Sequence, residues 1–161
     1  MGLIPTGGSL PGTAAVHELG FDLNGRRTSA VSGNLSAEVP PEFARAVRLA
    51  LRYLHETRRI SQSVLLGSLV VYERAGEASL EQRILALRGL LCEHVEKLAR
   101  SPRTEPSYRA LLHSYLAPAS TQILAAERAI MAYGTYRRYL ASGLAEVAAT
   151  LWLHEHALKQ T

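Results

Sequence analysis

The chain has 161 residues, of which 47% are hydrophobic and 20% are charged, and its formal net charge is +4. This length suits one domain of ordinary size with a tail, or two very small helical modules. The composition is that of a globular protein and excludes a wholly disordered one. The small positive charge favours an acidic partner such as a phosphate backbone, although many proteins that bind no nucleic acid carry as much.

Two further observations bear on location. Cys92 is the single cysteine, so the chain has no internal disulfide, which fits a reducing cytoplasm. No apolar run approaches the roughly 20 residues needed to span a bilayer, and the N-terminus lacks the basic and apolar segments of a signal peptide. We therefore expect a soluble cytoplasmic protein with no membrane partner.

Residues 1–39 are rich in Gly, Ser, Thr and Pro and show no sustained hydrophobic period. A segment of this composition cannot bury enough apolar surface to offset the entropy lost on ordering. We expect a flexible arm, or one that docks on the domain or on a neighbouring chain. Residues 40–161 should then form a single helical domain.

The first helix of that domain should begin at Pro41, since proline is tolerated in a first turn. Apolar residues recur there at helical spacing, and they are Phe43, Val47, Ala50, Leu51 and Leu54. Arg45, Arg48 and Arg52 form a second stripe on another face. That stripe is either a phosphate-binding surface or an ordinary solvated face.

Residues 61–74 are ambiguous, because the run VLLGSLVVY could form a buried strand. No partner strand is visible elsewhere, so a short buried helix is the better interpretation. Ser79 can cap the next helix, whose apolar residues lie on one face; they are Leu80, Ile84, Leu87, Leu91, Val95 and Leu98. Another helix starts near Pro106 and stops at Pro118. The predicted fold class is all-α, a compact multi-helix domain ending in a long helix.

The segment after Pro118 reads as two helices joined by a tight turn. Ser120 or Thr121 can cap a short helix, TQILAAERAI, and residues 131–133 form the turn before a long helix. At 100° per residue, one side of the long helix is apolar; it carries Tyr136, Leu140, Gly143, Leu144, Val147 and Leu151. The opposite side carries Thr135, Arg138 and Ser142, and Arg137 lies on a flank. A DNA-recognition helix needs this division.

The same stretch resembles the C-terminal helix-turn-helix of sigma-factor region 4 and related bacterial transcriptional regulators. The resemblance covers residues 106–153. The matching residues are Thr121, Gln122, Ala125, Ala126, Glu127 and Arg128, followed by Gly134, Thr135, Tyr136, Arg137, Arg138, Leu140, Gly143 and Leu144. It implies a helix-turn-helix at residues 121–144 that binds double-stranded DNA.

The turn departs from the family's pattern. There it usually reads Leu-Gly-Leu-Ser, and the glycine supplies a positive φ. Here the residues are Ala129, Ile130, Met131 and Ala132, and a β-branched residue is costly in a left-handed conformation. Either the bend has a different geometry, or the module has drifted away from reading DNA. Ala132 also lacks the polar side chain expected to cap the second helix.

Other candidate sites have simpler interpretations. The histidines of His154-Glu155-His156 point to different sides of a helix, so they cannot easily hold one metal ion, and we expect a solvated helix end. Tyr136 should lie in the core, whereas Tyr133 and Tyr139 are exposed candidates for phosphate or partner contact. We find no catalytic constellation and expect neither an enzyme nor a bound cofactor or metal.

The first functional hypothesis is therefore a DNA-binding transcription regulator. Phosphate contacts would come from Arg128, Arg137 and the arginines of the first helix, and limited base reading from Thr135, Arg138 and Ser142. The remaining members of the predicted site are Thr121, Gln122, Tyr133 and Gly134. A single small module rarely suffices for DNA binding, so we expect a homodimer or a larger protein assembly.

The second hypothesis is a protein-interaction adapter or structural subunit built on a degenerate helix-turn-helix. It would bind its partner through Tyr133, Tyr139 and the N-terminal arm. Ile130 separates the two hypotheses. A turn that still bends there favours DNA binding, and a continuous or splayed helix favours the adapter.

Overall fold

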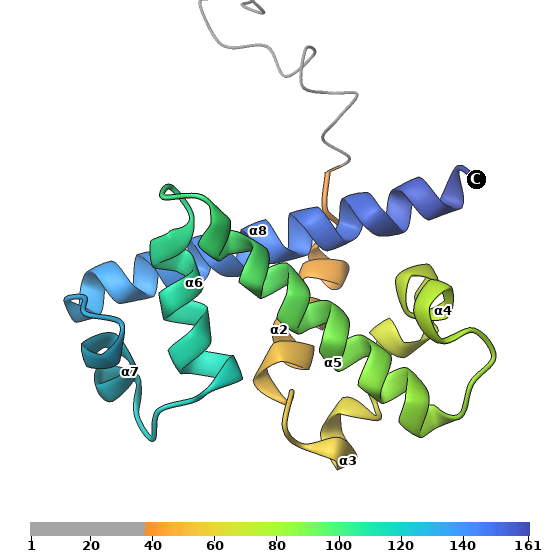
Figure 1. Ribbon diagram of the computed structural model, residues 1–161, viewed down its shortest axis with the longest axis horizontal. Coiled ribbons are helices and arrows are strands. Elements are labelled where there is room, and N and C mark those ends of the chain that lie inside the picture. The colour runs from red at the N-terminus through yellow and green to blue at the C-terminus, as the bar shows by residue number, and fades with distance from the viewer. Residues whose placement is uncertain (1–37) are drawn as a thin grey trace, which may run out of the picture. The chain divides into compact units, whose positions relative to one another are not determined.

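The computed structural model describes residues 38–161, so the predicted N-terminal arm lies almost wholly outside the described residues. The described part is all-helical, with no strand, which confirms the predicted fold class (Figure 1). Its α-helices are α2 (Pro41–Arg52), α3 (Thr57–Ile60), α4 (Leu69–Ala75), α5 (Leu80–Lys97), α6 (Glu105–Leu111), α7 (Gln122–Arg128) and α8 (Tyr133–Lys159). Shorter turns join them, namely η1 (Val64–Gly67), η2 (Leu98–Arg100) and the π-helical η3 (Leu112–Leu116).

Local sequence signals set several helix ends. Pro41 occupies the first turn of α2, as expected. Ser79 starts α5 with a capping box, in which its hydroxyl accepts from the Gln82 amide and the Gln82 side chain accepts from the Ser79 amide, both at 3.3 Å. Gly76, with φ of 60°, ends α4. These ends need no tertiary contact to explain them.

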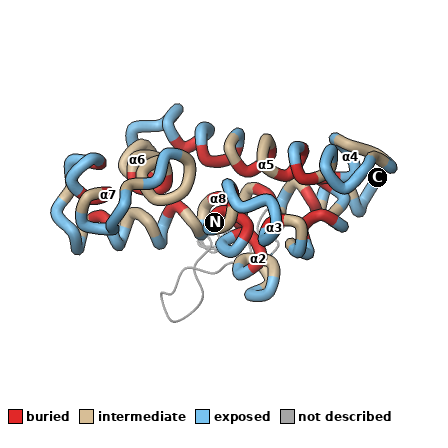
Figure 2. Tube along the Cα trace, turned by 90° about the horizontal axis from the view of Figure 1, so that it is seen from below, coloured by how far each residue is buried: buried red, intermediate tan, exposed pale blue. Residues whose placement is uncertain are grey.

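α8 is the helix on which the others assemble. Its 27 residues span about 40 Å at 1.5 Å per residue, and it packs against α2, α4, α5, α6 and α7 (Figure 1). The predicted apolar side is the packed one: Tyr136, Gly143, Val147 and Leu151 are buried, and Leu140 and Leu144 are half-buried. Figure 2 shows the same division, with buried segments facing the neighbouring helices and exposed ones facing out.

Gly143 brings α8 unusually close to α6. A Cβ atom added there would lie 2.9 Å from Leu111 Cδ1 and 3.1 Å from Ser107 Cβ. Ser107 and Leu111 are themselves buried. A side chain at position 143 would therefore require Leu111 and Ser107 of α6 to shift.

Residues 61–74 do not form the single helix that we expected. The chain makes η1, becomes extended at Ser68 (ψ of 156°), and then starts α4 at Leu69. The Ser63 hydroxyl accepts from the Leu65 amide at 3.3 Å, which favours a short tight turn over a continuous helix. The segment is nevertheless buried and helical, as predicted, although it forms two short helices and not one. Its buried residues are Leu65, Leu66, Val70 and Val71.

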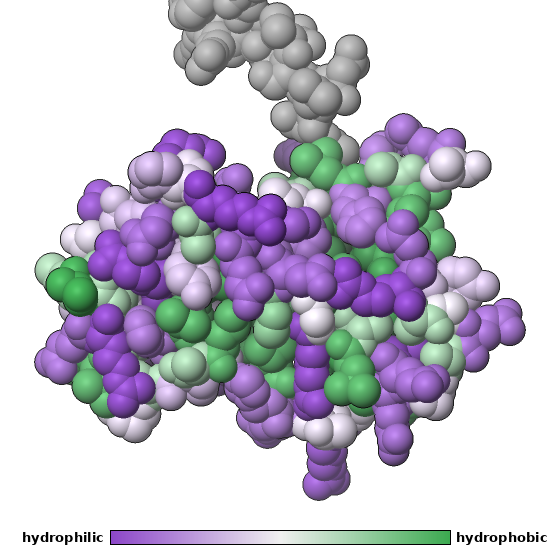
Figure 3. All heavy atoms as spheres, viewed as in Figure 1, coloured by the Kyte–Doolittle hydropathy of each residue, from purple (hydrophilic) through white to green (hydrophobic). Residues whose placement is uncertain are grey.

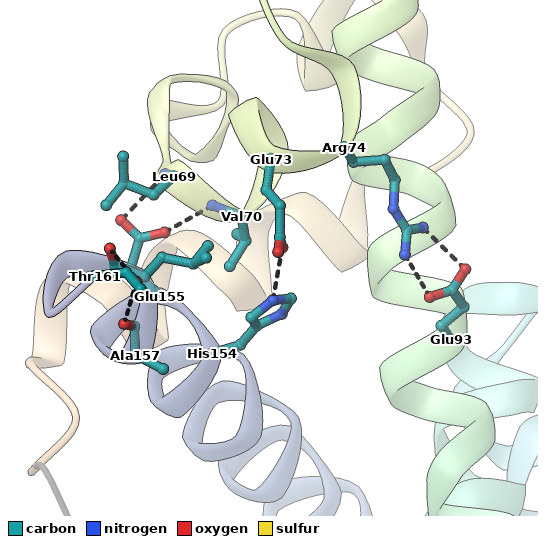
Figure 4. Close-up of polar contacts among 10 residues, drawn as sticks. Leu69, Val70, Glu73, Arg74, Glu93, His154, Glu155, Ala157 and Thr161 are labelled. Carbon is teal, nitrogen blue, oxygen red and sulfur yellow. Dashed lines mark hydrogen bonds and ion pairs between the residues drawn. The ribbon is translucent and has the colours of Figure 1, made fainter.

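Glu155 corrects another expectation. It is only 6% exposed, and its carboxylate accepts from the amides of Leu69 at 3.2 Å and Val70 at 3.0 Å (Figure 4). Ser68 makes no side-chain cap at α4, so this carboxylate from α8 takes over the capping. The adjacent His154 pairs with Glu73 of α4 at 2.8 Å. The predicted solvated helix end is thus a docking site for α4.

Two more polar contacts fix α5 in place. Arg74 of α4 makes a two-pronged pair with Glu93, at 2.9 and 2.7 Å (Figure 4). His94 is 5% exposed and bonds the Thr150 hydroxyl of α8 through Nδ1 at 3.0 Å. Burial, together with the nearby Lys97, lowers the pKa of His94 to about 4. His94 is therefore a neutral hydrogen-bonding group inside the fold at neutral pH.

Replacing Glu155 by Gln should destabilise the fold. The amide side chain keeps one acceptor oxygen but presents an NH₂ group to the second backbone N–H, and an unsatisfied buried group costs about 1–3 kcal/mol. Chemical denaturation measures the loss. Glu146→Gln is the matched control, because Glu146 lies on the same helix and makes only a 4.0 Å pair with the exposed Arg103. Equal effects of the two changes would contradict the capping role.

Candidate nucleic-acid interface

α7 and the beginning of α8 pack through a small alanine-rich core. Ala125, Ala126 and Ala129 of the α7 region are buried together with Ala110 and Tyr136. Small side chains let α7 approach α6 and α8 closely, and the large Tyr136 ring fills the space between them. This core places the two predicted helices of the 121–144 unit against each other, at the end of α8 where α7 lies (Figure 1).

The turn between α7 and α8 retains a left-handed residue even though glycine is absent. Ile130 has a φ of 58°. Its amide donates to the Glu127 carbonyl, and the Met131 amide donates to the Ala126 carbonyl, both at 3.0 Å. This pair of bonds is a Schellman motif, in which glycine normally takes the left-handed place. The chain therefore bends tightly at Ile130 rather than continuing as one helix.

Two features accompany this strained conformation. Ile130 is 82% exposed, so its side chain has little packing to offset the backbone strain. Arg109 of α6 donates from Nη1 to the Ala129 carbonyl at 2.7 Å and is held by Glu105, with Arg109 Nε 3.0 Å from Glu105 Oε1. This arginine satisfies a carbonyl at the end of α7. Sequence reasoning missed it, although the Glu105 and Arg109 spacing of four residues was visible.

α8 begins without a side-chain cap at Ala132, as the sequence predicted. Tyr133 ties the two helices together instead, because its hydroxyl donates to Gln122 Oε1 at 2.9 Å. Its ring stacks on that of Tyr136 at 6.2 Å between centroids. The Arg137 guanidinium lies 5.9 Å from the centre of the Tyr133 ring. Gln122, Tyr133 and Arg137 thus form one connected group on the surface.

The structure brings most of the predicted site residues to the surface of the α7–α8 unit. The exposed ones are Thr121, Gln122, Arg128, Tyr133, Gly134, Arg137, Arg138 and Ser142. The Thr121 hydroxyl caps α7 by accepting from the Leu124 amide at 3.1 Å, as expected. Two residues differ from prediction: Thr135 is half-buried, and Tyr139 is half-buried against the alanine-rich core. Both lie nearer the packed side than helix geometry alone indicated.

The exposed surface of this unit is basic. Residues 121–144 contain Arg128, Arg137 and Arg138 against one acid, Glu127. Within residues 38–161 none of these three arginines takes part in an ion pair. Burial and the charge of Arg128 lower the pKa of the neighbouring His113. Three guanidinium groups are therefore available to an anionic ligand.

The unit also exposes apolar side chains. Ile123 of α7 is 63% exposed and Ile130 is 82% exposed. In the space-filling view, an apolar spot lies on the end of the molecule where α7 is found (Figure 3). Isolated exposed isoleucines are ordinary on protein surfaces, but two on one short helix and its turn form a second candidate contact surface.

Residues 38–161 contain no group of three or more His, Cys, Asp or Glu side chains placed to hold a metal ion. In the same part of the chain, no helix combines the length and the apolar character needed to cross a membrane. Comparisons with models of protein families, with curated proteins and with solved structures gave no match to this chain.

Replacing Ile130 by Gly should stabilise the protein by about 1 kcal/mol. Glycine relieves a left-handed conformation that costs an L-residue roughly 1–2 kcal/mol, and the exposed side chain contributes little packing. Ile130→Val is the control, because it keeps the β-branch and should leave the free energy of unfolding nearly unchanged. If the glycine variant melts at a lower temperature than the parent, the turn does not hold the strained conformation described.

Proposed function

We propose that the protein binds double-stranded DNA through the α7–α8 unit and belongs to the class of transcription regulators. The observation that carries the proposal is the tight bend at Ile130, with its Schellman bonding. A helix-turn-helix needs such a bend to set its second helix against the first and leave the beginning of the second helix free to enter the major groove. The turn is the feature that the sequence left open.

The proposal assigns different ligands to the exposed groups. Arg138 and Ser142 are four residues apart on the exposed side of α8, so both would face base edges in the groove. Arg137, beside Tyr133 on the flank, would bind a phosphate, as would Arg128 at the end of α7. Thr121 and Gln122, where α7 begins, would also lie along the sugar-phosphate backbone.

One such unit offers few contacts, so the proposal includes a second one. Three arginines can neutralise only a few phosphates, and specific binding by helix-turn-helix proteins usually uses two units placed one DNA turn apart. We propose a homodimer or a larger protein assembly that supplies the second unit.

A second candidate function is protein binding through the α7–α8 unit. The exposed Ile123 and Ile130 favour it, because apolar side chains gain free energy when a protein partner covers them. Tyr139, by contrast, is half-buried and offers less contact surface than expected. The Ile130→Gly variant separates the two functions: a DNA-binding protein keeps its affinity for DNA, and an adapter loses affinity for its protein partner.

The two arginines of α8 should respond differently to replacement by alanine. Loss of Arg138 should cost about 1–3 kcal/mol of binding and relax the preference at one base position. Loss of Arg137 should weaken binding to all duplexes alike. The slope of log K against log [salt] should become less steep by the contribution of about one phosphate contact. Fluorescence anisotropy with labelled duplexes at several salt concentrations measures both effects.

Thermal melts provide the control for this experiment. Both arginines are exposed and make no ion pair within residues 38–161, so neither change should alter the melting temperature much. If the Arg138→Ala protein binds DNA as well as the parent, α8 does not read the groove. Absence of any binding by the parent at low salt would exclude DNA as the partner.

A further inference from the structure

α2 presents a second set of unpaired arginines on the surface. Arg48 and Arg52 are exposed and four residues apart, so they lie on one face of the helix. Neither takes part in an ion pair within the described residues 38–161. Arg52 has one neighbour of note, the Tyr53 ring, whose centre is 5.7 Å from its guanidinium carbon.

Tyr115 of η3 links this pair of arginines to the α7–α8 unit. Burial raises the pKa of Tyr115, Tyr136 adds to the rise, and Arg48 and Arg52 oppose it. The phenol of Tyr115 therefore lies within electrostatic reach of both arginines and of Tyr136, which is buried beneath α7.

The backbone of η3 fixes this arrangement. His55, just after α2, bonds through Nε2 to the carbonyls of Tyr115 at 2.8 Å and Leu116 at 3.1 Å. Ser114 of the same turn hydrogen-bonds the Tyr136 hydroxyl. The end of η3 is thus tied to the segment that follows α2, and its middle residue is tied to α8. These contacts set the position of α2 relative to the beginning of α8.

We propose that Arg48 and Arg52 form a second phosphate-binding site, which grips the DNA backbone beside the stretch of duplex that α8 enters. This inference rests on the proposed function and names a further part of the same interface. Paired guanidinium groups on one helix face suit phosphate oxygens, which they can bind in two-pronged fashion.

The dimensions of the fold permit one duplex to contact both sites. α2 crosses α8 where Phe43 meets Trp152, with ring centroids 4.9 Å apart. Trp152 is fourteen residues beyond Arg138, and Arg48 and Arg52 are five and nine residues beyond Phe43. These separations are about 21 Å along α8 and about 8 and 14 Å along α2, each shorter than one DNA turn of about 34 Å. In Figure 2, α2 and α5 lie on opposite sides of α8, so α5 does not cover α2 on its outer side.

The test compares two double variants of the full chain that carry the same change in charge. Arg48→Gln with Arg52→Gln removes the proposed site. Arg58→Gln with Arg100→Gln is the control, because both residues are exposed, lie on α3 and η2, and make no ion pair within residues 38–161. The probe is a fluorescein-labelled duplex of mixed sequence, about two turns long, and affinity is measured by anisotropy across a salt series.

The Arg48/Arg52 variant should bind more weakly, with the slope of log K against log [salt] less steep by about 1.8, or 0.9 for each lost phosphate contact. The control variant should change the slope by much less. Equal slopes in the two variants would overturn the site, because net charge alone would then explain the effect. Binding equal to the parent's would also overturn it.

The same series separates this inference from the proposed function. Arg137→Ala is measured beside the two double variants. If Arg137→Ala weakens binding and the Arg48/Arg52 variant does not, the helix-turn-helix proposal stands and the second site is wrong. A parent protein that binds no duplex at low salt refutes the proposed function, and the second site falls with it. Circular dichroism of each variant confirms that the helices are intact.

Discussion

The close contact between α6 and α8 at Gly143 is the constraint on which the α7 end of the structure depends. A side chain there would collide with Leu111 and Ser107, so glycine allows the two helices to pack this closely. Ala110 of α6 contributes to the same small core as Tyr136 of α8 and the alanines of α7. A wider spacing of α6 and α8 would open that core and release α7. The proposed DNA-binding surface therefore depends on a residue that would never touch DNA.

The turn at Ile130 shows how backbone bonding can override side-chain preference. Isoleucine is a poor choice for a left-handed position, and the sequence could not tell whether the bend would survive it. The structure keeps the bend because two backbone hydrogen bonds and Arg109 satisfy the carbonyls at the end of α7. The strain falls on one exposed residue, while the buried alanines and Tyr136 hold the helices on either side. Replacement of Ile130 by glycine would therefore not lower the stability of the fold.

The sequence predicted those features that depend on residues close to one another along the chain. The starts of α2, α5 and α7 follow from a proline, a capping box and a threonine cap, and the apolar side of α8 follows from helix periodicity. Most of the predicted surface residues are exposed for the same reason. Thr135 and Tyr139 differ because the width of the packed side depends on how α6 and α7 cover α8, and periodicity does not contain that information.

The features that escaped prediction join residues far apart in the chain. Glu155 caps a helix that begins 86 residues earlier, and its sequence neighbourhood, between two histidines at the end of a helix, indicates only a polar surface. The break in the helix at Ser68 depends on the same contact. α4 can begin after Ser68 because the Glu155 carboxylate accepts hydrogen bonds from the first two amides of α4. Arg109 and the His55 contact to η3 are of this kind too. Each places a polar group according to tertiary packing, which a single sequence does not reveal.

The most direct test of the central claim is the change in backbone amide chemical shifts when a short DNA duplex is added to the isotopically labelled protein. The account predicts shifts concentrated in residues 121–145, with a second group around Arg48 and Arg52, and small changes in α4 and most of α5. Shifts that cluster on α4 and α5, or none at low salt, would contradict it.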